Sequence, residues 1–187
     1  MNATRQDITE IITSTIRDVH MDVKLKHERT GVNMMYDFIK DEVLVDCERV
    51  QAACAELSEQ MPLKTYVEVL TLHELGHALD REALLASLDL ATERYEVKQL
   101  VITGKKATDL PYIEMLLEEH ESDILFEKTA WNNAEMLNRF FQVVDWNCFE
   151  TVKAHSMATY EALLHADLKL YEHLVKSTAA ADVPLLT

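Results

Sequence analysis

The sequence predicts a predominantly helical α+β protein with one small sheet near its beginning. Glycine and proline together account for only six of the 187 residues, which disfavours a turn-rich all-β chain. Strand-like patterns are confined to residues 21–46, whereas apolar residues recur at helical spacing before and after that segment. The chain is long enough to bury a core of its own. We therefore expect a single domain over residues 1–187.

The first helix and the strands follow from a change in periodicity. Apolar residues spaced three and four apart predict an amphipathic helix over residues 5–19. After residue 20, the pattern alternates or becomes rich in β-branched residues, with a turn signal at Gly31. We therefore expect a three-stranded antiparallel meander over about residues 21–46. Its expected strands are residues 21–25, 32–39 and 42–46.

The rest of the chain is expected to be helical. A helix that begins after Cys47 ends before Pro62, and Pro62 suits the first turn of the next helix, where its missing N–H is not needed. The polar stretch 103–109 is the clearest internal break, and Pro111 then begins helical material that reaches about residue 177. The expected helices include 62–86 and 90–102, and breaks are expected near Asn132–Asn133 and Asp145. This division gives a core of about residues 1–130 and a helical extension of 131–178.

Charge and cysteine content exclude several classes of function. Thirty-three acidic and eighteen basic residues give a formal charge of −15, which disfavours binding to nucleic acids and anionic membranes. No apolar run approaches the roughly 18 residues of a membrane-spanning helix, and the first residues lack the apolar stretch of a signal peptide. The three cysteines are too few for a disulfide framework, and with no base at a suggestive spacing we expect them to be small buried hydrophobic residues. We expect a cytoplasmic protein.

The most informative segment is the pattern His-Glu-x-x-His within the helix expected over 62–86. Histidines four residues apart project from one helix face, so His73 and His77 can bind one metal ion. Glu74 lies on the same rim and can reach a metal-bound water, from which it would accept a proton as general base. A glycine inside a helix costs about 1 kcal/mol relative to alanine. We therefore expect another stretch of backbone to approach closely at Gly76.

The residues VLTLHELGHALD, at positions 69–80, resemble the active-site helix of the zincin metallopeptidases. A small β meander followed by a helix and then this motif is similar to the compact gluzincin-type zincins of the ImmA/IrrE kind, over about residues 33–130. The resemblance implies a zincin-like fold, a zinc ion and cleavage of a protein or peptide substrate. In such proteins an extended peptide commonly adds to a sheet edge, so one strand of the meander is the expected platform.

A catalytic zinc ion needs a third protein ligand. In gluzincins it is a glutamate from a later helix, in the pattern Glu-x-x-x-Asp, whose aspartate supports a zinc-binding histidine. The resemblance therefore implies Glu119 as the third ligand and Asp123 as the supporting residue. Asp80, three residues after His77, is a second candidate for a residue that supports a ligand imidazole.

Helical periodicity leaves the choice of the third ligand open. On a helical wheel, Glu121 lies about 80° from the apolar stripe of the expected helix, and Glu119 lies about 120° from it. Glu121 is therefore a rival to Glu119, and His120, which lies in the stripe itself, is a further option. The stripe consists of Ile113, Leu117, His120, Ile124 and Trp131.

The leading hypothesis is a zinc metallopeptidase of gluzincin type. In this hypothesis His73, His77 and Glu119 hold Zn²⁺, and Glu74 is the general base. One alternative is a catalytically inactive, zincin-like binding or regulatory protein whose C-terminal helices cover the cleft. A further alternative is a purely structural helical protein, in which the two histidines bind no metal.

Overall fold

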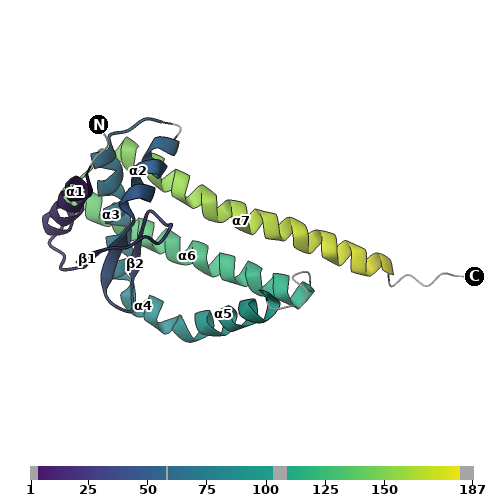
Figure 1. Ribbon diagram of the computed structural model, residues 1–187. Coiled ribbons are helices and arrows are strands. Elements are labelled where there is room, and N and C mark those ends of the chain that lie inside the picture. Colours follow the sequence, from purple (N-terminus) through teal and green to yellow (C-terminus); the bar gives the residue numbers. More distant parts are fainter. Residues whose placement is uncertain (1–3, 58, 103–108, 182–187) are drawn as a thin grey trace, which may run out of the picture. The chain divides into compact units, whose positions relative to one another are not determined.

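The computed structural model describes residues 4–57, 59–102 and 109–181 (Figure 1). Helices predominate and one small sheet lies near the beginning of the chain, which confirms the coarse fold class. The expected break over 103–109 falls almost entirely outside the described residues. The elements are α1 (Arg5–Asp18), β1 (Lys24–His27), β2 (Met34–Asp37), β3 (Glu42–Val45), α2 (Cys47–Glu56), α3 (Leu63–Leu79), α4 (Arg81–Ala86), α5 (Leu88–Ile102), α6 (Leu110–Phe141) and α7 (Trp146–Ala181).

The sheet is mixed, so the prediction of an antiparallel meander is wrong. Its strand order is β1-β3-β2, with β3 in the middle. β2 pairs antiparallel with β3, as a hairpin should, but β1 pairs with β3 in parallel. The central place suits β3, because three of its four residues are buried, whereas the residues of β1 alternate between exposed and half-buried.

The loop between β1 and β2 explains this topology. The backbone N–H of Glu28 donates to Val45 O at 3.1 Å, at the end of β3. Further along the loop, the N–H of Gly31 donates to the Asp46 carboxylate at 3.2 Å, and the N–H of Asp46 donates to Asn33 O at 3.1 Å. Gly31 has a φ of 76°, a conformation that glycine adopts without strain. These hydrogen bonds hold the loop across the end of β3, so that β2 pairs with β3 on the side opposite β1.

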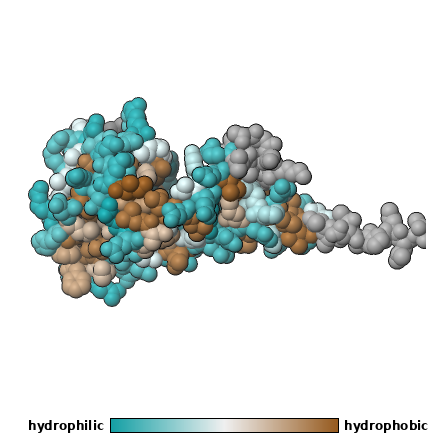
Figure 2. All heavy atoms as spheres, turned by 90° about the horizontal axis from the view of Figure 1, so that it is seen from below, coloured by the Kyte–Doolittle hydropathy of each residue, from teal (hydrophilic) through white to brown (hydrophobic). Residues whose placement is uncertain are grey.

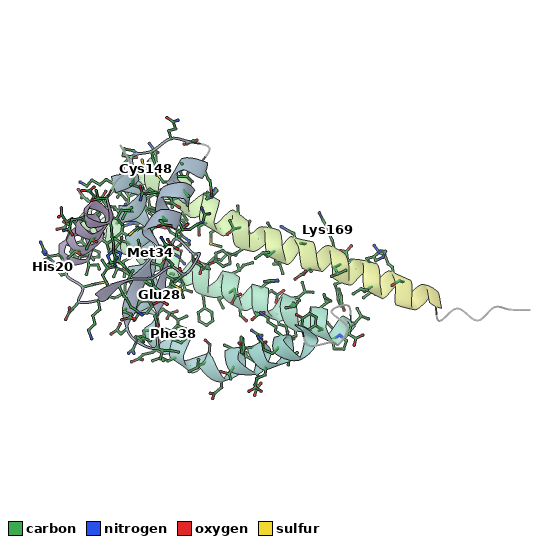
Figure 3. All side chains as sticks on the ribbon, viewed as in Figure 1. His20, Glu28, Met34, Phe38, Cys148 and Lys169 are labelled. Carbon is green, nitrogen blue, oxygen red and sulfur yellow. The ribbon has the colours of Figure 1, made fainter. Side chains whose placement is uncertain are left out.

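The helix that carries the His-Glu-x-x-His motif, α3, is the most buried element. It packs against α1, α2 and β2, and its residues from Val69 to Gly76 are all buried. On β2, the sulfur of Met34 (labelled in Figure 3) lies 3.9 Å from the Thr71 hydroxyl oxygen. A helix that is apolar on nearly all sides belongs in a core rather than on a surface. The motif is therefore seated in the interior.

Gly76 marks a close contact between α3 and α6, as the sequence predicted. A Cβ atom built at Gly76 would lie 2.1 Å from the backbone oxygen of Ala130, so no larger residue fits without a shift of one helix. The amide of Asn133 donates to Gly76 O at 3.0 Å across the same contact. α6 continues through Asn132–Asn133, so the break expected there is absent, and the helix ends only at Phe141.

The described chain divides into two compact units. One comprises Met1–Leu85 and Phe126–Met157, and the other comprises Ala86–Leu125 and Ala158–Thr187. The sheet and the main hydrophobic core belong to the first unit. The expected single domain, with a core ending near residue 130, stays a prediction, because compactness alone does not establish which parts fold independently.

The outer surface mixes polar and apolar side chains. Hydrophilic residues cover much of the face seen in Figure 2, interrupted by hydrophobic patches. Among the described helices, none combines the length and the apolar character needed to cross a membrane.

Candidate metal centre

The two motif histidines lie one turn apart on the buried side of α3. His73 is 6% exposed and Glu74 4%, whereas His77, near the end of the helix, is half-buried. The two imidazole centroids are 4.7 Å apart. The helical spacing thus brings both rings to one place, as the sequence predicted.

A third residue, Glu127 of α6, completes the group. Its carboxylate oxygens lie 3.1 Å from His73 Nε2 and 3.3 Å from His77 Nε2, and the residue is 8% exposed. One ligand atom from each of the three residues lies within 4.8 Å of the other two. Within the described part of the chain, this is the group of histidine, cysteine and acidic side chains that could hold a metal ion.

The site keeps Glu127 ionised and favours a charged His77. Burial alone would raise the pKa of Glu127, but the hydrogen bonds and charges of His73 and His77 hold it well below its usual range. Burial opposes a proton on His77, yet the hydrogen bond to Glu127 and the negative charges of Glu74, Glu127 and Asp80 raise its pKa. The centre therefore attracts positive charge, whether protons or a cation.

Glu74 lies beside this group without belonging to it. Its complete burial raises its pKa, and the charge of Glu127 adds to that effect, while the two histidines lower it in part. The backbone N–H of Tyr36, on β2, donates to the Glu74 carboxylate. The general-base candidate thus lies between the ligand group and the sheet.

Aromatic packing orients one of the ligands. The Trp131 indole stacks on the His73 imidazole, with centroids 4.2 Å apart and planes 22° apart. Trp131 also makes a T-shaped contact with Phe149, with ring centroids 5.6 Å apart. Both aromatic residues are fully buried. The His73 ring is therefore oriented by packing against Trp131 as well as by its contact with the Glu127 carboxylate.

The donor set fits a three-ligand metal centre. Two imidazole Nε2 atoms and one carboxylate are the ligands of His₂Glu zinc sites. The ionised, buried Glu127 would offset the charge of a dication. One feature departs from the usual pattern: His73 Nδ1 is buried without a hydrogen-bond partner among the described residues, whereas metal-binding histidines commonly donate this N–H to an acceptor.

The residues expected to supply or support the third ligand lie elsewhere. Glu119 forms an ion pair with Lys98 of α5, and His120 lies 2.9 Å from the Asp167 carboxylate of α7. Glu121 and Asp123 are exposed on α6. None of these four belongs to the ligand group that the structure brings together, and Glu127 stands in their place.

Asp80 follows the last residue of α3, Leu79, and its backbone N–H bonds the carbonyls of Ala78 and His77. Its carboxylate acts on His77 through charge, because it contributes to the raised pKa of that imidazole. This effect of its charge on His77 is the interaction that links Asp80 to the candidate site, where it was expected to support a ligand imidazole.

No family model matches the chain, and neither does any of the curated proteins or solved structures compared with it. The resemblance to gluzincins of the ImmA/IrrE kind thus rests on the motif and on the His73, His77 and Glu127 group. Beyond this group, no match supports membership of that family.

Glu127 carries a signal that the sequence contains. It lies three residues after Ile124 and four before Trp131, both of which belong to the apolar stripe. An acidic residue inside a buried stripe must be paired or bind a cation, because an isolated buried charge is very costly. Glu119 and Glu121 lie outside the stripe, and solvent or surface ion pairs satisfy such residues.

Proposed function

We propose that this protein is a metal-dependent peptidase in which His73, His77 and Glu127 hold zinc and Glu74 is the general base. One observation carries the proposal: two helices converge so that three ligand atoms lie within 4.8 Å of one another, with a buried glutamate adjacent in sequence to the first ligand. Structural zinc sites usually have four protein ligands, whereas catalytic sites have three and one open position. The set of three favours a catalytic centre.

The residues divide the chemistry between them. A bound zinc ion would polarise the scissile carbonyl and lower the pKa of a water molecule. Glu74 would take the proton from that water and pass it to the leaving amine. Burial raises the pKa of Glu74 towards neutral pH. A group whose pKa is near the working pH can act both as a general base and as a general acid. Glu127 and the two histidines would hold their positions throughout.

The sheet offers a place for an extended substrate. β2 pairs with β3 on one side and with no second strand in the described part of the chain. The Tyr36 N–H of this strand bonds Glu74, so the strand lies directly beside the general base. A peptide that pairs with the open edge of β2 would therefore pass close to Glu74.

A substitution of Glu74 tests the proposal. Glu74→Gln keeps the shape of the side chain but removes the base, so the variant should bind about one zinc ion per chain and lose activity by about 10²-fold to 10⁴-fold. Elemental analysis and turnover of a peptide library by the zinc-loaded protein measure the two properties. Glu121→Gln, which changes an exposed glutamate of α6, is the control. Full activity of Glu74→Gln contradicts the assigned base.

The burial of the site favours a second candidate function. His73, Glu74 and Glu127 are all buried, which suits a metal held for regulation or stability as well as one used in hydrolysis. This candidate is a zincin-like binding protein without peptidase activity. It predicts stoichiometric zinc binding together with no turnover of the library by the wild-type chain. If neither zinc binding nor turnover is found, both candidates fail.

A further inference from the structure

A second group of reactive side chains lies apart from the metal centre, where α1, β1 and α2 meet. Cys47, the first residue of α2, places its Sγ 3.3 Å from Nδ1 of His27 at the end of β1. The other nitrogen of the same imidazole, Nε2, lies 3.0 Å from the Thr9 hydroxyl of α1. The fold thus supplies Cys47 with a base that lies 20 residues away in sequence.

The proton positions in this group follow from one hydrogen bond. The Thr9 hydroxyl has a single hydrogen, which it donates to Arg5 O at 2.7 Å. Towards His27 the hydroxyl can therefore only accept, so the imidazole carries its proton on Nε2. In the neutral ring this leaves a lone pair on Nδ1, which faces the Cys47 thiol. The thiol donates to that lone pair, as a nucleophile does to its base.

The environment of Cys47 makes such a base necessary. Burial raises the pKa of the Cys47 thiol most strongly. The charge of Arg5 and a backbone hydrogen bond lower this pKa in part, while the charges of Asp46 and Glu48 raise it further. Burial and the charge of Arg5 lower the pKa of His27, which keeps the imidazole neutral. At neutral pH the group therefore contains a protonated thiol beside a neutral base. A thiolate must be generated during the reaction, because little of it is present beforehand.

We propose that Cys47 is a thiol-oxidation site that reacts with hydroperoxides, with His27 as its general base and Thr9 as the residue that positions the imidazole. In this step the Cys47 sulfur attacks one peroxide oxygen while the thiol proton moves to His27 Nδ1. An S–O bond forms and the O–O bond breaks, so one electron pair passes from sulfur to the peroxide. The departing hydroxide takes the proton from His27 and leaves as water, and Cys47 becomes a sulfenic acid.

A hydroperoxide suits this site better than a charged reagent. Cys47 is half-buried, so a small molecule reaches it most easily. The nearby charges are of both signs, and the whole chain has a formal charge of −15, which repels anionic electrophiles. Hydrogen peroxide is small and neutral and brings its own oxidising equivalents.

The wild-type chain contains its own control. Cys54 is also half-buried and burial also raises its pKa, but its thiol points to a backbone carbonyl, Met61 O at 3.8 Å, rather than to an imidazole. The full-length protein is treated with hydrogen peroxide and dimedone, which traps sulfenic acids, and each cysteine peptide is quantified by mass spectrometry. Cys47 should be trapped about tenfold or more faster than Cys54. Equal rates for the two cysteines overturn the proposal.

Variants and a pH profile separate a base from a merely structural histidine. When the pH is lowered from about 8.5 to 6.5, the trapping rate at Cys54 should fall about tenfold per pH unit, because the fraction of thiolate falls by that factor. The trapping rate at Cys47 should fall less steeply. The charged groups that face Cys47 are Arg5, Asp46 and Glu48. His27→Gln should lower the Cys47 rate to that of Cys54 and restore the steep profile.

Thr9→Val should slow Cys47 as well, whereas Thr9→Ser, which keeps the acceptor oxygen, should restore the wild-type rate. Circular dichroism checks that each variant is folded. An unchanged Cys47 rate in folded His27→Gln contradicts the role of the base. If that variant does not fold, the wild-type comparison of Cys47 with Cys54 and its pH profile decide the question.

Discussion

At the scale of single residues, the buried carboxylate of Glu127 lies against both imidazoles of the candidate metal centre. Burying a carboxylate is costly unless it is paired, and here each oxygen faces one histidine nitrogen, at 3.1 and 3.3 Å. The same two nitrogens are the atoms that a metal ion would take. Glu127 therefore preorganises the histidines in the absence of metal.

The role of Glu127 can be tested against the other acids of α6. Glu127→Gln should weaken zinc binding by more than the roughly 10-fold to 100-fold loss that follows removal of an outer partner, because it removes a ligand. Glu119→Gln and Glu121→Gln should leave zinc affinity close to that of the wild type. Competition titration with a chromogenic chelator measures all three affinities. The assignment of the third ligand fails if Glu119→Gln or Glu121→Gln loses zinc and Glu127→Gln does not.

The sequence predicted part of this centre for a clear reason. His73 and His77 lie four residues apart on one helix, so local geometry alone brings them together. The third member of the group, Glu127, comes from another helix, and its position depends on how α3 and α6 pack. The pattern Glu-x-x-x-Asp favoured Glu119, which lies about 12 Å along the helix axis from Glu127. Helical periodicity favoured Glu121 over Glu119, and neither argument named Glu127, although it lies three residues after Ile124 of the apolar stripe.

At the scale of elements, the spacing between α3 and α6 is set by backbone atoms. Gly76 brings α3 against the Ala130 carbonyl of α6, and Glu127 lies three residues before that contact. His77 follows Gly76 directly. The distance between the two ligand-bearing helices therefore depends on the absence of a side chain at position 76.

Gly76→Ala should destabilise the protein although alanine is the better helix former. The added methyl group meets the Ala130 carbonyl, and overpacking of this kind costs about 1–3 kcal/mol, against a gain in helix propensity of about 1 kcal/mol or less. We expect a lower urea midpoint and weaker zinc binding, because Glu127 moves away from the histidines. Leu79→Ala, which alters an exposed residue of the same helix, is the control. Increased stability of Gly76→Ala contradicts the close contact.

The sheet shows what element-level prediction could not supply. β2 and β3 lie within the segments whose patterns indicated strands, whereas β1 only overlaps the end of the expected strand 21–25 and continues to His27. Alternation and β-branched residues are local signals. The pairing of β1 with β3 depends on hydrogen bonds between the β1–β2 loop and Asp46. One of these bonds joins Gly31 to Asp46, which lies 15 residues later in the sequence. A long-range bond of this kind leaves no periodic trace, so adjacent strands were expected to pair in chain order.

At the scale of the whole molecule, two of the 33 acidic residues, Glu74 and Glu127, are buried at the candidate metal centre. The charge of Glu127 helps to raise the pKa of Glu74, so two buried carboxylates repel each other there. A dication would relieve this repulsion in the folded state only, because the unfolded chain separates the ligands. Metal binding should therefore stabilise the fold.

Zinc should raise the melting temperature of the wild-type chain. At a free concentration 100 times the dissociation constant, binding contributes about 2.7 kcal/mol, which corresponds to a rise of about 5–10 °C for a chain of this size. Differential scanning calorimetry with zinc and with chelator measures the shift. The double variant His73→Ala/His77→Ala should show no such rise. The same rise in that variant would place the zinc elsewhere.

Trp131, stacked on His73, gives the molecule an optical property. The chain has two tryptophans. The other one, Trp146, is 41% exposed, and its ring contacts Phe149 rather than His73 or His77. A cation on His73 Nε2 would change the charge of a ring that lies 4.2 Å from the Trp131 indole, and indole emission is sensitive to such a neighbour. In a Trp146→Phe background, the protein would carry a single tryptophan, whose selectively excited emission would report occupancy of the candidate metal site in real time and without a label.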